Sequence, residues 1–255
     1  MPFVLLRILV ATLIAFVGVG FGVVLGRVSL RHLNMLVYAG VGALLAITVC
    51  DVLPDAKGVL SWPAFLAATV SGYALFWLIG KYVSPVCPAC AITAFDEQTT
   101  QKLGQTALLL MVALGVHSAM DGMAIATGDA VAGRANLGVL FGVSFHKLPE
   151  GLALALLLIG AGYSRRSALL WSFAIEATTV LGGLLGMFAL QGASLAWLGL
   201  LFGHVGGGFL YLVTSALGLF PAHGRRLPER SLMMVGGLTF LFTSLLLWVI
   251  GKYVK

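Results

Sequence analysis

The chain has 255 residues, of which 60% are hydrophobic and only 9% are charged, and its mean hydropathy is +1.05. A soluble domain of this length carries roughly 25% charged residues, so the composition excludes an ordinary soluble protein. The net charge of +6 is scattered over short polar segments, which excludes a nucleic-acid-binding protein because no soluble domain is left to carry a basic face.

Eight long apolar runs follow one another along the chain. Each is long enough to cross a hydrocarbon layer of about 30 Å. Runs this continuous predict helices, because only helices and closed barrels satisfy their backbone in lipid. We expect an all-α polytopic membrane protein with a single transmembrane domain over residues 1–255. The runs cover residues 3–26, 33–53, 60–82, 104–127, 135–161, 167–190, 194–220 and 231–251.

The first run contains Arg7 near its start and resembles a signal peptide in this respect. It lacks a small-residue cleavage site, and its apolar stretch of roughly 19 residues exceeds the 7–15 residues of a signal sequence. We interpret it as the first membrane helix.

Basic residues predict the orientation of the helices, because cytoplasmic loops carry an excess of Lys and Arg. Nine basic residues fall in the odd-numbered loops: Arg27, Arg31, Lys81, Lys102, Arg165, Arg166, Arg225, Arg226 and Arg230. Five fall in the even-numbered loops or near the termini: Arg7, Lys57, Arg134, Lys252 and Lys255. This bias predicts that both termini lie outside the cytoplasm.

The cysteines do not form a disulfide framework. Cys50 lies in the second run, whereas Cys87 and Cys90 form a single CxxC in the third loop. A structural zinc site normally needs two such halves or additional histidines. We favour a tight turn around Pro88, with metal contact as the alternative.

Two acid–histidine pairs lie within the fourth and fifth runs. His117 is followed four residues later by Asp121, and His146 by Glu150. Residues at this spacing share one helix face. Charged side chains at membrane depth are costly and mark functional sites by default. Two imidazoles and two carboxylates on adjacent helices are a ligand set that suits a divalent transition metal.

The two pairs are expected at one depth. Residues 128–133 turn the chain between two antiparallel helices. His117 and His146 each lie about 14 residues from that turn, or about 21 Å along a helix. Lys147 and Glu176 fall at the same level, which is near the middle of the bilayer.

Other polar residues near the helix ends have two readings. Asp51 and Asp55 close the second run, where we expect helix-end groups in water. The alternative is an acidic funnel that concentrates cations at the outer mouth. His223 lies at the expected cytoplasmic exit and is a candidate to bind a leaving ion. His204, isolated in the seventh run, is expected to be a hydrogen-bond partner in helix packing.

Residues 48–56 and 215–223 are weakly similar to one another. The two segments end helices of opposite direction, so the similarity suggests an inverted relation between helices 1–3 and 6–8. Inverted repeats are frequent in secondary transporters.

The segments HSAMDG (117–122) and HKLPEG (146–151) resemble the paired signature motifs of the ZIP family of divalent metal transporters, most of all its prokaryotic short-loop members. The similarity extends to Asp51–Asp55 and to Gly206–Tyr211, and it covers the whole chain in helix number and motif order. The resemblance implies eight helices in a 3+2+3 inverted-repeat arrangement. Helices 1–3 lie near 3–82, the site helices 4 and 5 near 104–161, and helices 6–8 near 167–251.

The resemblance also implies a function. Its transport site maps onto His117, Asp121, His146 and Glu150, and the expected activity is Zn²⁺ uptake toward the cytoplasm. Fe²⁺, Mn²⁺, Co²⁺, Ni²⁺ and Cd²⁺ remain alternatives, because selectivity often depends on geometry and availability. The metal is then a substrate, and no cofactor is expected. The implied location is the bacterial inner membrane, with the lipid bilayer and, as an option, a second copy of the chain as partners.

This chain departs from the family pattern at three positions. Many members build a second metal site from the residue after each motif histidine and a helix 6 carboxylate. Here those residues are Ser118, Lys147 and Glu176. A protonated lysine cannot ligate and repels a second cation. The resemblance therefore implies one metal site, with the Lys147 ammonium in place of the second ion and paired with Glu176 or Glu150.

The resemblance further implies motion. Helices 4 and 5 are expected to carry the site past a more static frame that includes helices 2 and 7, with Gly206–Gly208 lining the seam.

Two other classes of protein compete with a transporter. An intramembrane metallohydrolase of the HExxH type needs a glutamate beside the first histidine, but Ser118 and Lys147 stand there. A metal sensor needs a soluble output domain, which residues 1–255 do not provide. We expect a transporter and not an enzyme.

Overall fold

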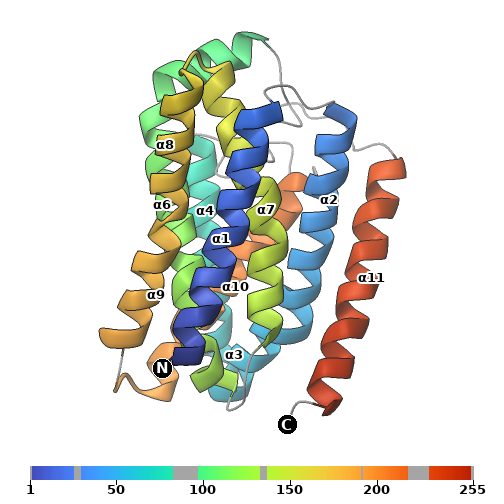
Figure 1. Cartoon of the computed structure of the whole chain (residues 1–255). Helices are drawn as coiled ribbons and strands as arrows, with labels where there is room; N and C mark the ends of the chain where they lie inside the picture. The colour runs from blue at the N-terminus through green and yellow to red at the C-terminus, as the bar shows by residue number, and fades with distance from the viewer. Residues whose placement is uncertain are drawn as a thin grey trace.

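The computed structural model describes residues 2–25, 30–82, 97–132, 137–190, 192–217 and 230–253. Within these ranges all regular structure is helical. The helices lie side by side along one long axis, and α1 begins at the end of the bundle where α11 ends (Figure 1). An all-helical protein is what the apolar runs predicted.

The helices follow the predicted runs closely. The second span continues through a π-helical turn, η1, into α3, and the sixth is divided at Ala177 into α8 and α9. In chain order the elements are α1 (Pro2–Leu25), α2 (Leu30–Ile47), η1 (Thr48–Val52), α3 (Leu53–Val59), α4 (Trp62–Tyr82), α6 (Glu97–Ala132), α7 (Leu137–Gly160), α8 (Arg165–Glu176), α9 (Thr178–Phe188), α10 (Leu195–Ala216) and α11 (Arg230–Tyr253).

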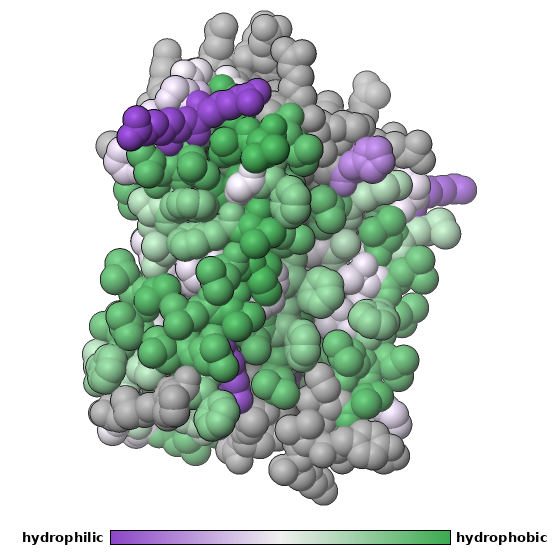
Figure 2. All heavy atoms as spheres, viewed as in Figure 1, coloured by the Kyte–Doolittle hydropathy of each residue, from purple (hydrophilic) through white to green (hydrophobic). Residues whose placement is uncertain are grey.

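Seven stretches of the described residues are long and apolar enough to cross a membrane. The remaining predicted run, 104–127, falls within α6, a helix of 36 residues. At 1.5 Å per residue α6 is about 54 Å long, which exceeds the thickness of the hydrocarbon layer. Figure 2 shows hydrophobic residues over the middle of one face and the most hydrophilic residues nearer its ends. These are the properties of an integral membrane protein.

Four helix pairs make the most extensive contacts: α1 with α7, α6 with α9, α4 with α10, and α2 with α11. Each pair is close because a glycine lets the backbones approach. A Cβ added at Gly18, Gly122, Gly207 or Gly42 would overlap the backbone of Leu148, Thr179, Thr69 or Gly236, respectively. Thus α6 packs most extensively against α9, and α7 packs most extensively against α1. The contact between α6 and α7 is less extensive than either.

The predicted place of the glycine triplet in α10 is wrong. A Cβ at Gly207 would overlap Thr69 in α4, and the nearest atoms to one at Gly208 belong to Phe76, also in α4. Gly206 faces the span formed by η1 and α3. The nearest neighbours of the triplet therefore belong to the second and third spans and not to α6 or α7.

The prediction that Asp51 lies in water is also wrong. Asp51 is 4% exposed, because the π-helical turn directs its side chain toward the bundle. Its carboxylate lies against Gly138, in the first turn of α7, where the helix dipole favours a negative charge. Asp55 is half-buried in the first turn of α3. Asp51 is therefore a buried residue at the contact of the second span with α7, and its role at a metal entry stays a prediction.

Three expectations fall outside the described residues. They concern His223 as an exit residue, the CxxC motif of Cys87 and Cys90, and the final residues of the weak repeat, 218–223.

Candidate metal centre

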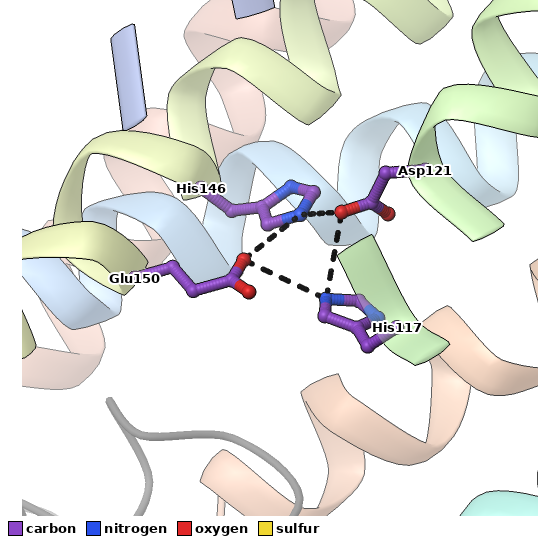
Figure 3. Close-up of side chains that lie close together, drawn as sticks. All are labelled: His117, Asp121, His146 and Glu150. Carbon is purple, nitrogen blue, oxygen red and sulfur yellow. Dashed lines mark hydrogen bonds and ion pairs between the residues drawn. The ribbon is translucent and has the colours of Figure 1, made fainter. Parts of the chain in front are cut away.

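Four side chains from two helices converge on one point. His117 and Asp121 project from α6, and His146 and Glu150 project from α7, as the four-residue spacings predicted (Figure 3). All four are buried, with exposed fractions between 0% and 9%. The two imidazole rings are 5.7 Å apart between centroids, so the histidines do lie level in the hairpin.

The separations between nitrogen and oxygen atoms suit a small cation. Asp121 Oδ2 lies 3.7 Å from His117 Nε2 and 3.2 Å from His146 Nε2. Glu150 Oε2 lies 3.6 Å and 3.7 Å from the same two nitrogens. A tetrahedral ion with bonds of about 2.0–2.1 Å places its ligand atoms about 3.4 Å apart. One ligand atom from each residue lies within 4.8 Å of all the others, so slight contraction would complete such a shell.

The tautomer of His146 indicates that a cation belongs in the cluster. Its Nδ1 lies 2.8 Å from the carbonyl oxygen of Gly142, which can only accept, so Nδ1 carries the hydrogen. A neutral ring then points the lone pair of Nε2 at Asp121 Oδ2, which is another acceptor. Two acceptors 3.2 Å apart repel one another unless a proton or a metal ion lies between them.

Two phenylalanines cover the histidines. The Phe76 ring of α4 lies 5.8 Å from His117, and the Phe209 ring of α10 lies 6.5 Å from His117 and 6.0 Å from His146. Both are 2% exposed. Among the described residues His117 Nδ1 has no hydrogen-bond partner, so ring packing is the visible constraint on its orientation. Nothing in the sequence distinguishes these two from the other phenylalanines among its 15.

Lys147 is fully buried beside the cluster. Its Nζ donates to Ser118 Oγ at 2.7 Å and lies 3.1 Å from Glu176 Oε2, so the expected contact with Glu176 is present. It also lies 3.0 Å from Asp121 Oδ2 and 3.3 Å from Glu150 Oε2. The contact with Asp121 was not predicted, because it depends on how α6 and α7 pack.

The charges of the cluster match one divalent ion. Metal ligation requires ionised carboxylates and neutral histidines. If Glu176 is ionised as the partner of Lys147, the three carboxylates of Asp121, Glu150 and Glu176 and the ammonium of Lys147 sum to −2. One divalent cation makes this buried group neutral, which matters because uncompensated buried charge is costly.

The other candidate residues lie apart from this cluster. Among the described residues, the group that brings three or more potential metal ligands together contains only the two acid–histidine pairs, without Asp51 or Asp55. His204 bonds to Ser71 through Nδ1 at 2.8 Å and so joins α10 to α4, as expected of a packing residue.

A buried group of two histidines and two carboxylates within a helical membrane protein defines a class, the metal-ion-handling membrane proteins. Comparison with known proteins agrees. The model of the ZIP zinc transporter family matches residues 91–242, more than half of the chain. The protein belongs to this family, and membership implies divalent metal ion transport and not enzymatic activity. None of the curated proteins matches the chain.

Proposed function

We propose that the protein carries divalent transition-metal ions, most directly Zn²⁺, across the membrane toward the cytoplasm. His117, Asp121, His146 and Glu150 hold the ion in transit. The observation that carries this proposal is the convergence of two imidazole nitrogens and two carboxylate oxygens within 4.8 Å in a buried position. The ion is the substrate, and no cofactor takes part.

Zinc is favoured by the donor set, because two nitrogen and two oxygen ligands in a tetrahedral shell are common for Zn²⁺. The same donors accept Fe²⁺, Mn²⁺, Co²⁺, Ni²⁺ and Cd²⁺, so competition among these ions is part of the test.

The 3+2+3 inverted repeat is part of the proposal, within a single transporter domain over 1–255. Helix pairing supports it. In span numbers, α1 is span 1, α2 to α3 span 2, α4 span 3, α6 span 4, α7 span 5, α8 and α9 span 6, α10 span 7 and α11 span 8. The inverted repeat exchanges span 1 with 6, 2 with 7, 3 with 8 and 4 with 5. This exchange turns the α1–α7 pair into the α9–α6 pair. The same exchange turns α4–α10 into α11–α2, and these are the four most extensive pairs. A pseudo-twofold axis in the membrane plane has this effect.

Orientation and location complete the proposal. The excess of basic residues in the odd loops supports both termini outside the cytoplasm. The cluster then lies near mid-bilayer. We further propose the inner membrane of a bacterium as the location and a homodimer as the assembly, both by similarity to the short-loop members of the family.

One ion per chain is proposed for each transport step. Lys147 stands where a second ion would otherwise sit, and its contacts with Glu176 and Ser118 support this reading.

Metal uptake by proteoliposomes tests the function. Asp121→Ala and Glu150→Ala should each reduce Zn²⁺ uptake to near background, because each removes one of four ligands. Asp129→Asn is the matched control: it removes a carboxylate from the same helix, where Asp129 pairs with Arg7 at 2.7 Å away from the cluster. Wild-type uptake by both alanine variants would overturn the site, and no uptake of any divalent metal by the wild type would overturn the function.

A further inference from the structure

The ammonium group of Lys147 contacts the same carboxylate oxygens of Asp121 and Glu150 that would bind a metal ion. Asp121 Oδ2 lies 3.0 Å from Lys147 Nζ and 3.2 Å from His146 Nε2. Glu150 Oε2 lies 3.3 Å from Lys147 Nζ and 3.6 Å from His117 Nε2. Asp121 Oδ2 therefore faces both the ammonium and the position of the ion, and so does Glu150 Oε2, although Glu150 Oε1 also lies 3.3 Å from Nζ.

Full contact of both cations with these oxygens is unfavourable. A metal ion about 2 Å from an oxygen that also holds the ammonium would lie within a few ångströms of a like charge. Little water is present to screen the repulsion, because Lys147 and Asp121 are both fully buried. Metal binding should therefore weaken the contacts of Lys147 Nζ with Asp121 Oδ2 and Glu150 Oε2.

The ammonium has a second set of partners beside the first. Glu176 Oε2 lies 3.1 Å and Ser118 Oγ 2.7 Å from Nζ, and Glu176 comes from α8 and is not among the four metal ligands. The other carboxylate oxygen, Glu176 Oε1, is buried and has no hydrogen-bond partner among the described residues. Glu176 can therefore accept a stronger contact from Lys147 without losing one elsewhere.

We propose that Lys147 is a tethered cation that partly compensates Asp121 and Glu150 when no metal is bound, and that it yields Asp121 Oδ2 and Glu150 Oε2 to the metal by shifting onto Glu176. This inference rests on the proposed function. The lysine keeps its charge throughout, and only its partners change. It lowers metal affinity, because each ion must displace an ammonium. It also reduces the buried charge of the three carboxylates from −3 to −2 when the carrier returns across the membrane without an ion.

Removal of the ammonium by Lys147→Met should affect net Zn²⁺ uptake and Zn²⁺ exchange differently. Lys147→Met leaves three carboxylates around the site without their internal cation, so Zn²⁺ should bind about tenfold or more tightly. Net uptake into zinc-free vesicles should fall, because it requires release and return of the empty carrier. Exchange of labelled Zn²⁺ between zinc-loaded compartments should persist, because the carrier then crosses loaded in both directions.

The role of Glu176 is tested in two backgrounds. Glu176→Gln should weaken Zn²⁺ binding in the wild type, because the ammonium loses the partner to which it retreats. In the Lys147→Met background the same change should have little effect. A general influence of the Glu176 charge would instead weaken binding equally in both.

The experiment is a Zn²⁺ titration of the purified full chain and its three variants, followed by net-uptake and exchange assays in proteoliposomes. Tighter binding by Lys147→Met, with exchange retained and the Glu176 effect abolished, supports the inference. Unchanged or weaker binding by Lys147→Met overturns it, as does an equal Glu176 effect in both backgrounds. If Lys147→Met does not fold, Lys147→Gln replaces it in both comparisons, and the same outcomes support or overturn the inference. Failure of the wild type to bind Zn²⁺ overturns the proposed function instead.

Discussion

At the scale of single residues, the cluster combines a ligand set with its own counter-charge. Asp121 and Glu150 each contact both histidines and Lys147, so neither the ligands nor the lysine act independently. Buried ion pairs of this kind are sensitive to the loss of one partner, because the remaining charge is left uncompensated. Replacement of the ammonium at position 147 by a carboxylate should therefore change how many ions the protein binds.

Lys147→Glu should raise the metal content from one ion per chain toward two. Four carboxylates then surround the site, and their total charge of −4 matches two divalent cations. Equilibrium dialysis against Zn²⁺ with metal analysis measures the ratio. Lys147→Met is the control, since it removes the ammonium without adding a ligand and should stay at one ion. Two ions bound by the wild-type protein would contradict the role given to Lys147.

Acidification should weaken metal binding. Histidine ligates as neutral imidazole and carboxylates ligate when ionised, so protons and metal compete for the same atoms. Apparent Zn²⁺ affinity should fall between about pH 7.5 and pH 5.5, the interval in which free histidine titrates. Competition with a zinc-sensitive dye measures it, and an affinity that stays constant over this interval would argue against ligation by His117 and His146.

The sequence predicted the meeting of the four ligands but not their surroundings. Helical spacing places Asp121 beside His117, and the distance of each histidine from the hairpin turn sets them level. The cover of Phe76 and Phe209 and the burial of Asp51 depend on how α4, α10 and η1 pack. Local spacing carries no information about such contacts, and a π-helical turn in the second span has no signal in the hydropathy pattern.

At the scale of helices, glycine positions determine which neighbours are close. Gly122 in α6 meets Thr179 in α9, and Gly18 in α1 meets Leu148 in α7. The site helices α6 and α7 therefore pack mainly against the first and sixth spans. The rings that cover the histidines come from α4 and α10, which pair with one another.

Gly207→Leu should destabilise the protein and reduce the yield of folded material. The added side chain overlaps the backbone at Thr69 and must separate α4 from α10. Gly237→Leu is the matched control, because a Cβ at Gly237 meets nothing within 4 Å. Thermal denaturation in detergent compares the two. A Gly207 variant as stable as the control would show that α4 and α10 are not held by this contact.

At the scale of the whole molecule, composition and the count of apolar runs were sufficient to predict an all-helical membrane protein. The pattern of helix pairs was not predictable from hydropathy, because lipid-facing and buried positions are both apolar in a membrane protein. Exposed Leu181 (64%) and buried Leu154 (0%) are the same residue type. Pairing follows small residues and polar contacts instead, and these contacts are visible only in the assembled bundle.

X-ray absorption spectroscopy of the zinc-loaded protein tests the central claim most directly, because it reports the atoms bound to the ion itself. The account predicts one Zn²⁺ per chain in a shell of two imidazole nitrogens and two carboxylate oxygens at about 2.0–2.1 Å. The imidazole signal should diminish in His117→Ala and in His146→Ala. A shell that contains sulfur, which would point to the cysteines, or one without histidine would contradict the account.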